Sequence, residues 1–310
     1  MAVRKTKRLN KVQQIDRTIN ARITRDLPKT TFALLDMKLN INHTYVSTAA
    51  TLLGLLNCIS SLQLIVNGRD TKVNIPAWCL YWINLFDAAA TPMQVINAGT
   101  AGPYDSYVYL RLPFACLNGV SPEDSVLDAR KFDSIVLEVN WAGLLMATET
   151  INSGYLQIEP NFYAQVPADI KPASHEFAYI NRNLDVAGEI RIDVPVKSLN
   201  QYSRIWVFTK NDSVVLADAQ ITNLRLETNT FVYMDTAAEF VHARNIKDYS
   251  LEVDAAPGTP YVGVYCLDMA NFGYMNQRID ARVLNELTLI LTSAVSNGFV
   301  YVVFEKMIYG

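Results

Sequence analysis

Three histidines are the residues best suited to build a metal site, and they stand far apart in the sequence. His43, His175 and His242 are each isolated, with no HxH or HExxH spacing. A metal-dependent β-barrel enzyme needs a tight histidine cluster with a carboxylate. The GxSxG, GxxxxGKS/T and GxGxxG patterns of nucleophile and phosphate sites are also missing from the sequence. We therefore expect no metal, no cofactor and no enzymatic activity.

Carboxylates and clustered aromatic rings are the other side chains that could act on a ligand. Glu123 and Asp124 fall at an expected helix start, where acidic residues need no catalytic role. Acidic residues on two strands could still form a glycosidase pair, and a carbohydrate-binding protein would stack sugars on rings such as those of AWCLYWINLF. Packing in a core or at a subunit contact is the commoner role of such rings. We expect that role for Trp78, Tyr81, Trp82 and Phe86.

Positive charge is concentrated in the N-terminal segment. Residues 1–29 carry +7 while the whole chain carries −3, so the remainder carries −10. A basic arm on an acidic body favours a polyanionic partner such as nucleic acid or anionic lipid. The side chains expected to make this contact are Arg4, Lys5, Lys7, Arg8, Lys11, Arg17, Arg22 and Arg25.

The same segment has apolar residues at helical spacing. Steps of three and four residues place them on one side of a helix, and Pro28 ends the run. The pattern predicts an amphipathic helix that either docks on its own domain or lies on an anionic surface or a neighbouring subunit. Its apolar stripe consists of Leu9, Val12, Ile15, Ile19 and Ile23.

From Thr31 onward the pattern becomes that of strands. β-branched and aromatic residues alternate with polar ones in MKLNI, YVYLRL and IVLEVNW. Turn signals separate the runs, and the strongest is Asn67–Gly68. Short helices are predicted over 47–56 and over 121–130, the latter because SPED offers an N-cap serine and a first-turn proline.

The strand-rich part of the chain contains an internal sequence repeat, with an offset of about 150–160 residues between the two copies. The matching segments, in the same order in both copies, are ISSLQL with ITNLRL, LLDMKLN with RIDVPVK, YVYLRLPF with YVGVYCLD, FDSIVLEV with LNELTLIL, and GYLQIEPNFY with GFVYVVFEKM. A repeat of this length is the size of a domain and too long for a solenoid unit.

The repeat predicts an all-β chain of two tandem eight-stranded jelly rolls with short helical insertions and an N-terminal amphipathic helix. We place the basic arm at 1–29, the first jelly roll at 30–170 and the second at 171–310, with the two prolines of VPADIKP marking the connector. The longest apolar stretch, residues 46–66, is interrupted too often by polar residues to span a bilayer. Cys58, Cys79, Cys116 and Cys266 are expected to be buried free thiols.

This pattern resembles a known family, the double-jelly-roll major capsid proteins of tailless icosahedral viruses, especially membrane-containing bacteriophages. The duplicated pattern over about 30–310 and the basic arm before it carry the resemblance, together with the segments before KFDSIVLEVNW and LNELTLILTS, which look like that family's helices preceding a strand. The resemblance is architectural, because the family has no short invariant motif.

The resemblance implies a structural virion protein. Three chains would form a homotrimer with six barrels, a pseudo-hexameric tile of an icosahedral shell. Implied partners are neighbouring capsomers and the penton and minor capsid proteins, with residues 1–29 facing an internal lipid membrane or the viral genome. The implied location is the capsid of the virion, assembled in the host cytoplasm.

Two other interpretations remain open. One is a carbohydrate-binding or carbohydrate-active double β-sandwich protein, which does not explain the basic arm. The other is a scaffold or spike protein of the same virion.

Overall fold

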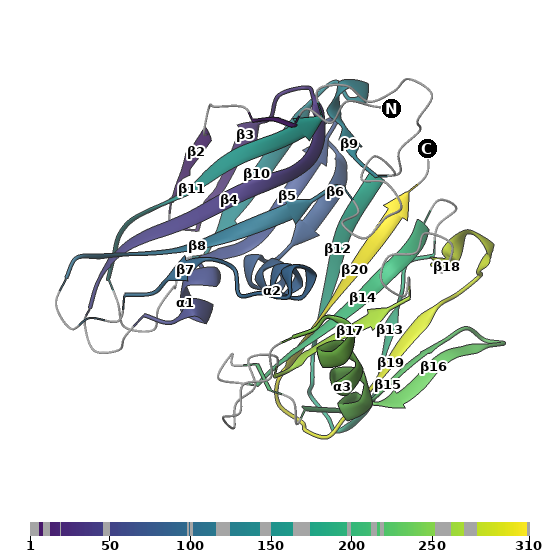
Figure 1. The fold of residues 1–310 in the computed structure, drawn as a ribbon. Helices are drawn as coiled ribbons and strands as arrows, with labels where there is room; N and C mark the ends of the chain where they lie inside the picture. The colour runs from purple at the N-terminus through teal and green to yellow at the C-terminus, as the bar shows by residue number, and fades with distance from the viewer. Residues whose placement is uncertain are drawn as a thin grey trace. The chain divides into compact units, whose positions relative to one another are not determined.

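The structure is a computed structural model that describes residues 6–8, 13–18, 20–45, 50–97, 99, 102–115, 125–142, 150–163, 174–196, 200–211, 216–217, 220–251, 262–269 and 278–308. The chain divides into two compact units, with a boundary between His175 and Glu176 (Figure 1). The predicted connector over 166–172 lies outside the described residues.

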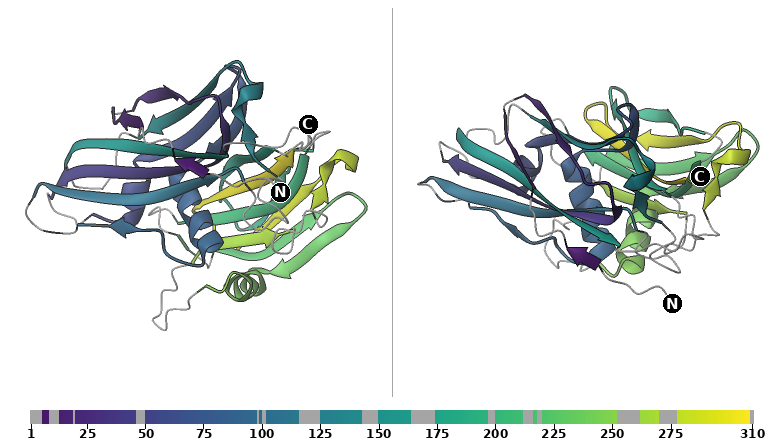
Figure 2. Two further views of the ribbon diagram at one scale, coloured as in Figure 1. Left: turned by 45° about the horizontal axis from the view of Figure 1, so that its top comes forward. Right: turned by 90° about the horizontal axis from the view of Figure 1, so that it is seen from above.

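Unit 1 is built on two antiparallel layers of strands. In one layer the order is β2-β11-β4-β8, and in the other it is β3-β10-β5-β6. The bounds are β2 (Gln13–Asp16), β3 (Arg22–Asp26), β4 (Thr31–Thr44), β5 (Ile59–Val66), β6 (Asp70–Ile75), β8 (Tyr104–Pro113), β10 (Ile135–Trp141) and β11 (Thr150–Tyr163). In Figure 2 the layer of β11, β4 and β8, coloured teal, purple and blue, can be followed from two further directions.

Shorter elements complete unit 1. β1 (Thr6–Arg8) pairs with β11, β7 (Gln94–Val95) with β8, and β9 (Leu127–Asp128) with β4. The helices are α1 (Leu52–Leu56), α2 (Ala77–Ala88) and the 3-10 helix η2 (Ala129–Lys131).

Unit 2 repeats this plan. Its layers have the orders β12-β20-β14-β17 and β13-β19-β15-β16. The strands are β12 (Ser174–Asn183), β13 (Gly188–Asp193), β14 (Asn200–Lys210), β15 (Ile221–Glu227), β16 (Val232–Ala237), β17 (Val264–Asp268), β19 (Thr288–Ser293) and β20 (Phe299–Ile308). The remaining elements are α3 (Ala238–Asp248), β18 (Ile279–Asp280), which pairs with β14, and the 3-10 helix η5 (Ala281–Val283).

The two units have the same topology. When the eight principal strands of each unit are numbered along the chain, the layer orders are 1-8-3-6 and 2-7-4-5 in both units. Two four-stranded antiparallel layers with this interleaved order form a jelly roll. The predicted fold class, two tandem jelly rolls with short helices, is therefore confirmed.

The topology also corrects one of the five repeat pairings. Four pairs occupy equivalent strands, namely β5 with β15, β8 with β17, β10 with β19 and β11 with β20. The pairing of LLDMKLN with RIDVPVK is wrong, because β4 is the third strand of unit 1 whereas β13 is the second strand of unit 2. The same alternation of apolar and polar residues recurs in every strand that faces a core, so a short match does not identify which strand it is.

The predicted N-terminal amphipathic helix is wrong for the residues described. Ile15 lies in β2 and Ile23 in β3, while Leu9, Val12 and Ile19 fall outside the described residues. β2 and β3 pair along β11 and β10 in continuous register, from Tyr155↔Asp16 and from Val136↔Asp26. The chain reverses between them near Asn20, whose φ is +52°. For the two described members of the stripe, Ile15 and Ile23, the helical spacing thus comes from β-branched residues on two successive strands, which a helical wheel does not distinguish.

The helices differ from prediction in extent. The helix predicted over 47–56 is confirmed only for Leu52–Leu56, where the Thr51 side chain accepts a hydrogen bond from the backbone N–H of Gly54. The described part of 121–130 contains β9 and the start of η2 in place of an α-helix. AWCLYWINLF forms most of α2, which is apolar except for Asn84 and Asp87 and so shows little helical periodicity.

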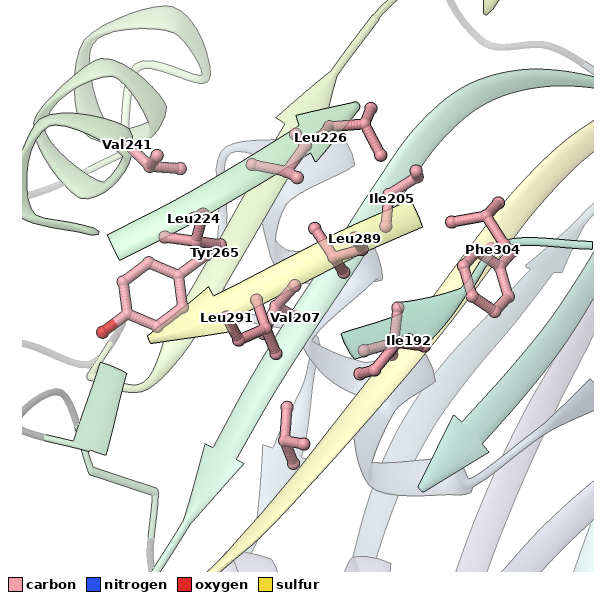
Figure 3. Packing of buried hydrophobic residues seen from close by; sticks show 14 of the residues in the cluster. Ile192, Ile205, Val207, Leu224, Leu226, Val241, Tyr265, Leu289, Leu291 and Phe304 are labelled. Carbon is pink, nitrogen blue, oxygen red and sulfur yellow. The ribbon is translucent and has the colours of Figure 1, made fainter. Parts of the chain in front are cut away.

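Side chains from both layers of unit 2 meet in one core. Figure 3 shows Ile205, Val207 and Phe304 from one layer facing Ile192, Leu224, Leu226, Leu289 and Leu291 from the other, with Val241 of α3 beside them. This interdigitation determines which face of each strand is turned toward the core. The residues between the core-facing ones therefore form the outward faces of the two layers.

Candidate functional site

The histidines do not converge. His43 lies in β4 with its Nε2 2.8 Å from the Ser106 Oγ, His175 lies in β12, and His242 of α3 lies edge-on to the Tyr265 ring. Across the described ranges no group of three or more His, Cys, Asp or Glu side chains is placed to hold a metal ion. Glu123 and Asp124 fall outside those ranges.

The aromatic cluster is core, as predicted. Trp78, Tyr81 and Phe86 of α2 are buried and Trp82 is half-buried, with the Tyr81 and Trp82 rings in edge-to-face contact at 5.4 Å. The buried rings of Trp78, Tyr81 and Phe86 present no open face on which a sugar could stack.

The predicted basic contact residues do not form a single described cluster. Arg4, Lys5 and Lys11 lie outside the described residues, and Lys7 and Arg8 belong to β1. The backbone N–H of Arg17 donates to the carbonyl of Gly154 at 2.7 Å, and burial lowers the pKa of its half-buried guanidinium.

Two arginines of β3 are engaged within unit 1. The Arg22 guanidinium forms an ion pair with the buried carboxylate of Glu138, and Arg25 donates to the backbone carbonyl of Gln14 at 2.5 Å. Because an ion takes several kcal/mol to bury without a partner, Arg22 has a structural role in this fold.

In each unit one asparagine holds a helix against a strand. In unit 1 the Asn84 side chain of α2 donates to the carbonyl of Arg111 and accepts from its N–H, both at 2.7 Å. In unit 2 Asn245 of α3 makes the same two bonds to Cys266, both at 2.8 Å. The side-chain amide thus takes the place of a neighbouring strand for one residue of β8 or β17. A single helical asparagine has no sequence signature, so only the structure reveals this motif.

A second shared motif precedes strand seven of each unit. Asp128 caps η2 by accepting from the Arg130 N–H and from the Arg130 guanidinium, and Asp280 does the same for η5 with Arg282. In both places the arginine's hydrogen bond lowers the pKa of the aspartate. The tripeptide Asp-Ala-Arg occurs at both positions, so an identity search between the copies would have found it.

Unit 2 contains a buried charged network on its first layer. Arg204 donates to both carboxylate oxygens of Glu305, at 2.6 and 3.0 Å, and Trp206 Nε1 donates to the same carboxylate at 3.2 Å. Beside it, the Tyr249 hydroxyl donates to Asp268 at 2.8 Å. Burial raises the pKa of Tyr249, so its hydroxyl stays protonated as a donor.

Large apolar side chains are exposed around α3. Phe231, Val232 and Tyr233 lie at the β15–β16 hairpin and Phe240 on α3, where Thr236, Phe240, Ala243, Arg244 and Lys247 line a shallow hollow of about 440 Å³. Patches of this kind on soluble proteins mark interaction sites. None of the described helices is long and apolar enough to cross a bilayer.

Comparison with known proteins establishes the fold. No protein-family model and no curated protein matches the sequence. A chain in the atomic structure of Sulfolobus Turreted Icosahedral Virus superposes over 98% of this chain and 90% of its own with a TM-score of 0.77 at 14% identity. The crystal structure of the STIV MCP matches over 98% and 96% with a TM-score of 0.77 at 15% identity.

A third structure is similar along its full length. The major capsid protein P2 of Bacteriophage PM2 matches over 99% of this chain and 98% of its own, with a TM-score of 0.66 at 12% identity. At these identities the likeness concerns the fold, which all three share with this chain from end to end.

Proposed function

We propose that this chain is the major capsid protein of an icosahedral virus. The observation that carries the proposal is the full-length match of two jelly rolls, with equal strand order, to capsid proteins of Sulfolobus Turreted Icosahedral Virus and Bacteriophage PM2. Partial matches would be expected for any β-sandwich, whereas a match over 98–99% of this chain covers both units.

The physical logic of the duplication supports this function. Three chains with two similar units each supply six barrels, so a ring of three approximates six-fold symmetry and can tile a shell. The units share a topology but differ in surface, since Phe240 on α3 of unit 2 is 60% exposed whereas α2 of unit 1 is buried along most of its length. Because of such differences, the two barrels of one chain can make different contacts with their neighbours, as a closed ring of identical chains requires.

The finer proposals concern the host, the membrane and the partners. We propose a bacteriophage with an internal membrane, and a chain that contacts neighbouring capsomers, penton and minor capsid proteins. Residues 1–29 would face lipid or genome, supported by their charge of +7. Because Arg22 and Arg25 are engaged within unit 1, this role falls mainly on Arg4, Lys5, Lys7, Arg8 and Lys11.

The oligomeric state of the purified protein tests the capsid proposal. Light scattering should give the mass of three 34.7 kDa chains. A monomer at all concentrations that can be reached, together with binding on a glycan array, would overturn the proposal in favour of a carbohydrate-binding protein.

The arm is tested by deleting residues 1–11, which leaves β2 and β3 in place. Each Lys or Arg near an anionic membrane contributes about 1 kcal/mol before screening. The deletion removes five basic residues, so binding to vesicles containing phosphatidylglycerol should fall more than tenfold. Equal binding by both proteins would show that the arm does not contact lipid, and a filter-binding assay with DNA then tests the genome.

A further inference from the structure

The helices α2 and α3 occupy equivalent places in their units but differ in exposure. Each follows strand five, and each holds strand six through its asparagine, Asn84 or Asn245. α2 is buried along nearly its whole length. α3 instead leaves Phe240 60% exposed. The helix surface that is buried in unit 1 is therefore uncovered in unit 2.

The outward sheet faces show the opposite asymmetry. The asparagine bonds identify Arg111 and Cys266 as equivalent positions, and the Arg111 side chain is 52% exposed while Cys266 is 2% exposed. The residues paired with them on strand three are Asp36 and Trp206. Asp36 is partly exposed, whereas Trp206 is fully buried. The outward sheet face around β4 and β8 is therefore exposed in unit 1, and its counterpart around β14 and β17 is buried in unit 2.

Each chain thus leaves one helix surface and one sheet face exposed, and their counterparts in the other unit are buried. We propose that the helix surface of one copy docks on the sheet face of a second copy. The helix surface comprises Phe231, Tyr233, Phe240, Ala243, Arg244 and Lys247, and the sheet face comprises Asp36, Lys38, Met93, Tyr107, Tyr109 and Arg111.

The size of the helix surface fits such a contact. Phe231 is 59%, Tyr233 39% and Phe240 60% exposed. At about 150–250 Å² for each ring, they offer roughly 300 Å² of apolar area. A stable interface buries about 800 Å² on each partner and is a little over half apolar. The three rings therefore supply about two thirds of the apolar part, and Arg244 and Lys247 contribute a polar rim.

The sheet face has matching chemistry. Tyr109 is 39% and Met93 63% exposed, so rings and a thioether are available to Phe240. Lys38 already lies 4.4 Å from the centroid of the Tyr107 ring, which shows that these tyrosines accept cations on their faces. Arg244 of a second copy would find the same kind of partner in the ring of Tyr109.

A helix surface meeting a sheet face joins two different patches, so the contact is heterologous. Repeated by a three-fold rotation, such a contact closes a ring. This inference rests on the capsid function proposed above, which needs a ring of three, and it identifies the residues at the contact.

Two single substitutions and their mixture test it. Phe240→Asp alters the helix surface and Tyr109→Asp the sheet face, and each should turn the trimer into monomer in light scattering. Val283→Asp, at a 78% exposed position on η5, is the matched control and should stay trimeric. Mixed in equal amounts, the first two variants retain one intact helix surface and one intact sheet face, so heterodimers should form.

The outcomes separate this inference from the function on which it rests. A wild-type protein that is always monomeric overturns the capsid function. A trimeric wild type with a trimeric Phe240→Asp variant overturns only the contact. A monomeric Phe240→Asp variant beside a trimeric Tyr109→Asp variant would indicate that α3 meets another α3, which also overturns it.

A measurement on the wild type does not depend on how the variants fold. Hydrogen exchange of the trimer and of diluted monomer should differ most in α3 and β8. Protection confined to other elements would contradict the contact.

Discussion

Replacing Asn245 by alanine should loosen one residue of β17. Among the described strands β17 ends its layer, so the outer N–H and carbonyl of Cys266 have the Asn245 side chain as their partner, at 2.8 Å each. Each hydrogen bond contributes about 1 kcal/mol net, and a buried group left without a partner costs about 1–3 kcal/mol. The expected loss is therefore about 2 kcal/mol if water replaces the amide and about 4 kcal/mol if it does not.

Native-state hydrogen exchange measures this loss at the amide concerned. At about 1.4 kcal/mol for each factor of ten, the Cys266 N–H should exchange roughly 30-fold faster or more. The equivalent Asn84→Ala change should accelerate Arg111 by a similar factor and leave Cys266 unaltered. These paired results would also establish that the two motifs are equivalent.

A surface asparagine supplies the control. Asn223 donates to Asp235 at 2.7 Å in an exposed pair, so Asn223→Ala should change stability by less than about 0.5 kcal/mol. The reasoning is refuted if Asn245→Ala accelerates Cys266 exchange less than threefold, because the side-chain amide would then not be the partner of that backbone.

Three further changes test other contacts. Glu305→Leu should lower the free energy of unfolding in urea by about 3–5 kcal/mol, because it leaves the charge of Arg204 buried without a partner. The double variant Glu305→Leu/Arg204→Met should recover most of this loss. An equal loss in the single and the double variant would contradict the pairing. Asp280 has a lowered pKa, so its stabilisation is complete above the unfolded value of about 4 and disappears as pH falls through the folded value. The difference between wild type and Asp280→Asn should accordingly be present at neutral pH and decline as the pH falls through the lowered pKa of Asp280; a difference that grows in acid would contradict this sign. Arg22→Ala should lower the free energy of unfolding by about 1–2 kcal/mol, because it removes the ion-pair partner of Glu138, and it should leave vesicle binding unchanged. Weaker vesicle binding would show that Arg22 does contact the membrane.

The alternation of apolar and polar residues predicted where the strands lie, but not which strand of one unit corresponds to which strand of the other. ISSLQL and ITNLRL both alternate, and both are strand four of their units. LLDMKLN alternates equally well, yet its true counterpart is β14, because the alternation records one buried face and nothing about the neighbour on either side. Pairing depends on partners more than a hundred residues away, such as Asp36 with Glu159.

The helices and the first two strands were harder to predict for opposite reasons. α2 is apolar except for Asn84 and Asp87, so it shows little of the periodicity that signals a helix. In Gln13–Asp26 a helical periodicity was present by coincidence, because Ile15 and Ile23 occupy separate strands whose turn falls near Asn20. The asparagine motifs and the exposed surface of α3 follow from tertiary packing, which no local pattern encodes.

Electron microscopy of the assembled protein tests the central claim most directly. Particles formed by this chain should be icosahedral shells tiled by trimers, each showing six barrels around a pseudo-six-fold axis. Within a tile, the density for α3 of one chain should lie against β4 and β8 of the next. Isolated monomers, or tiles built from any number of chains other than three, would contradict the account.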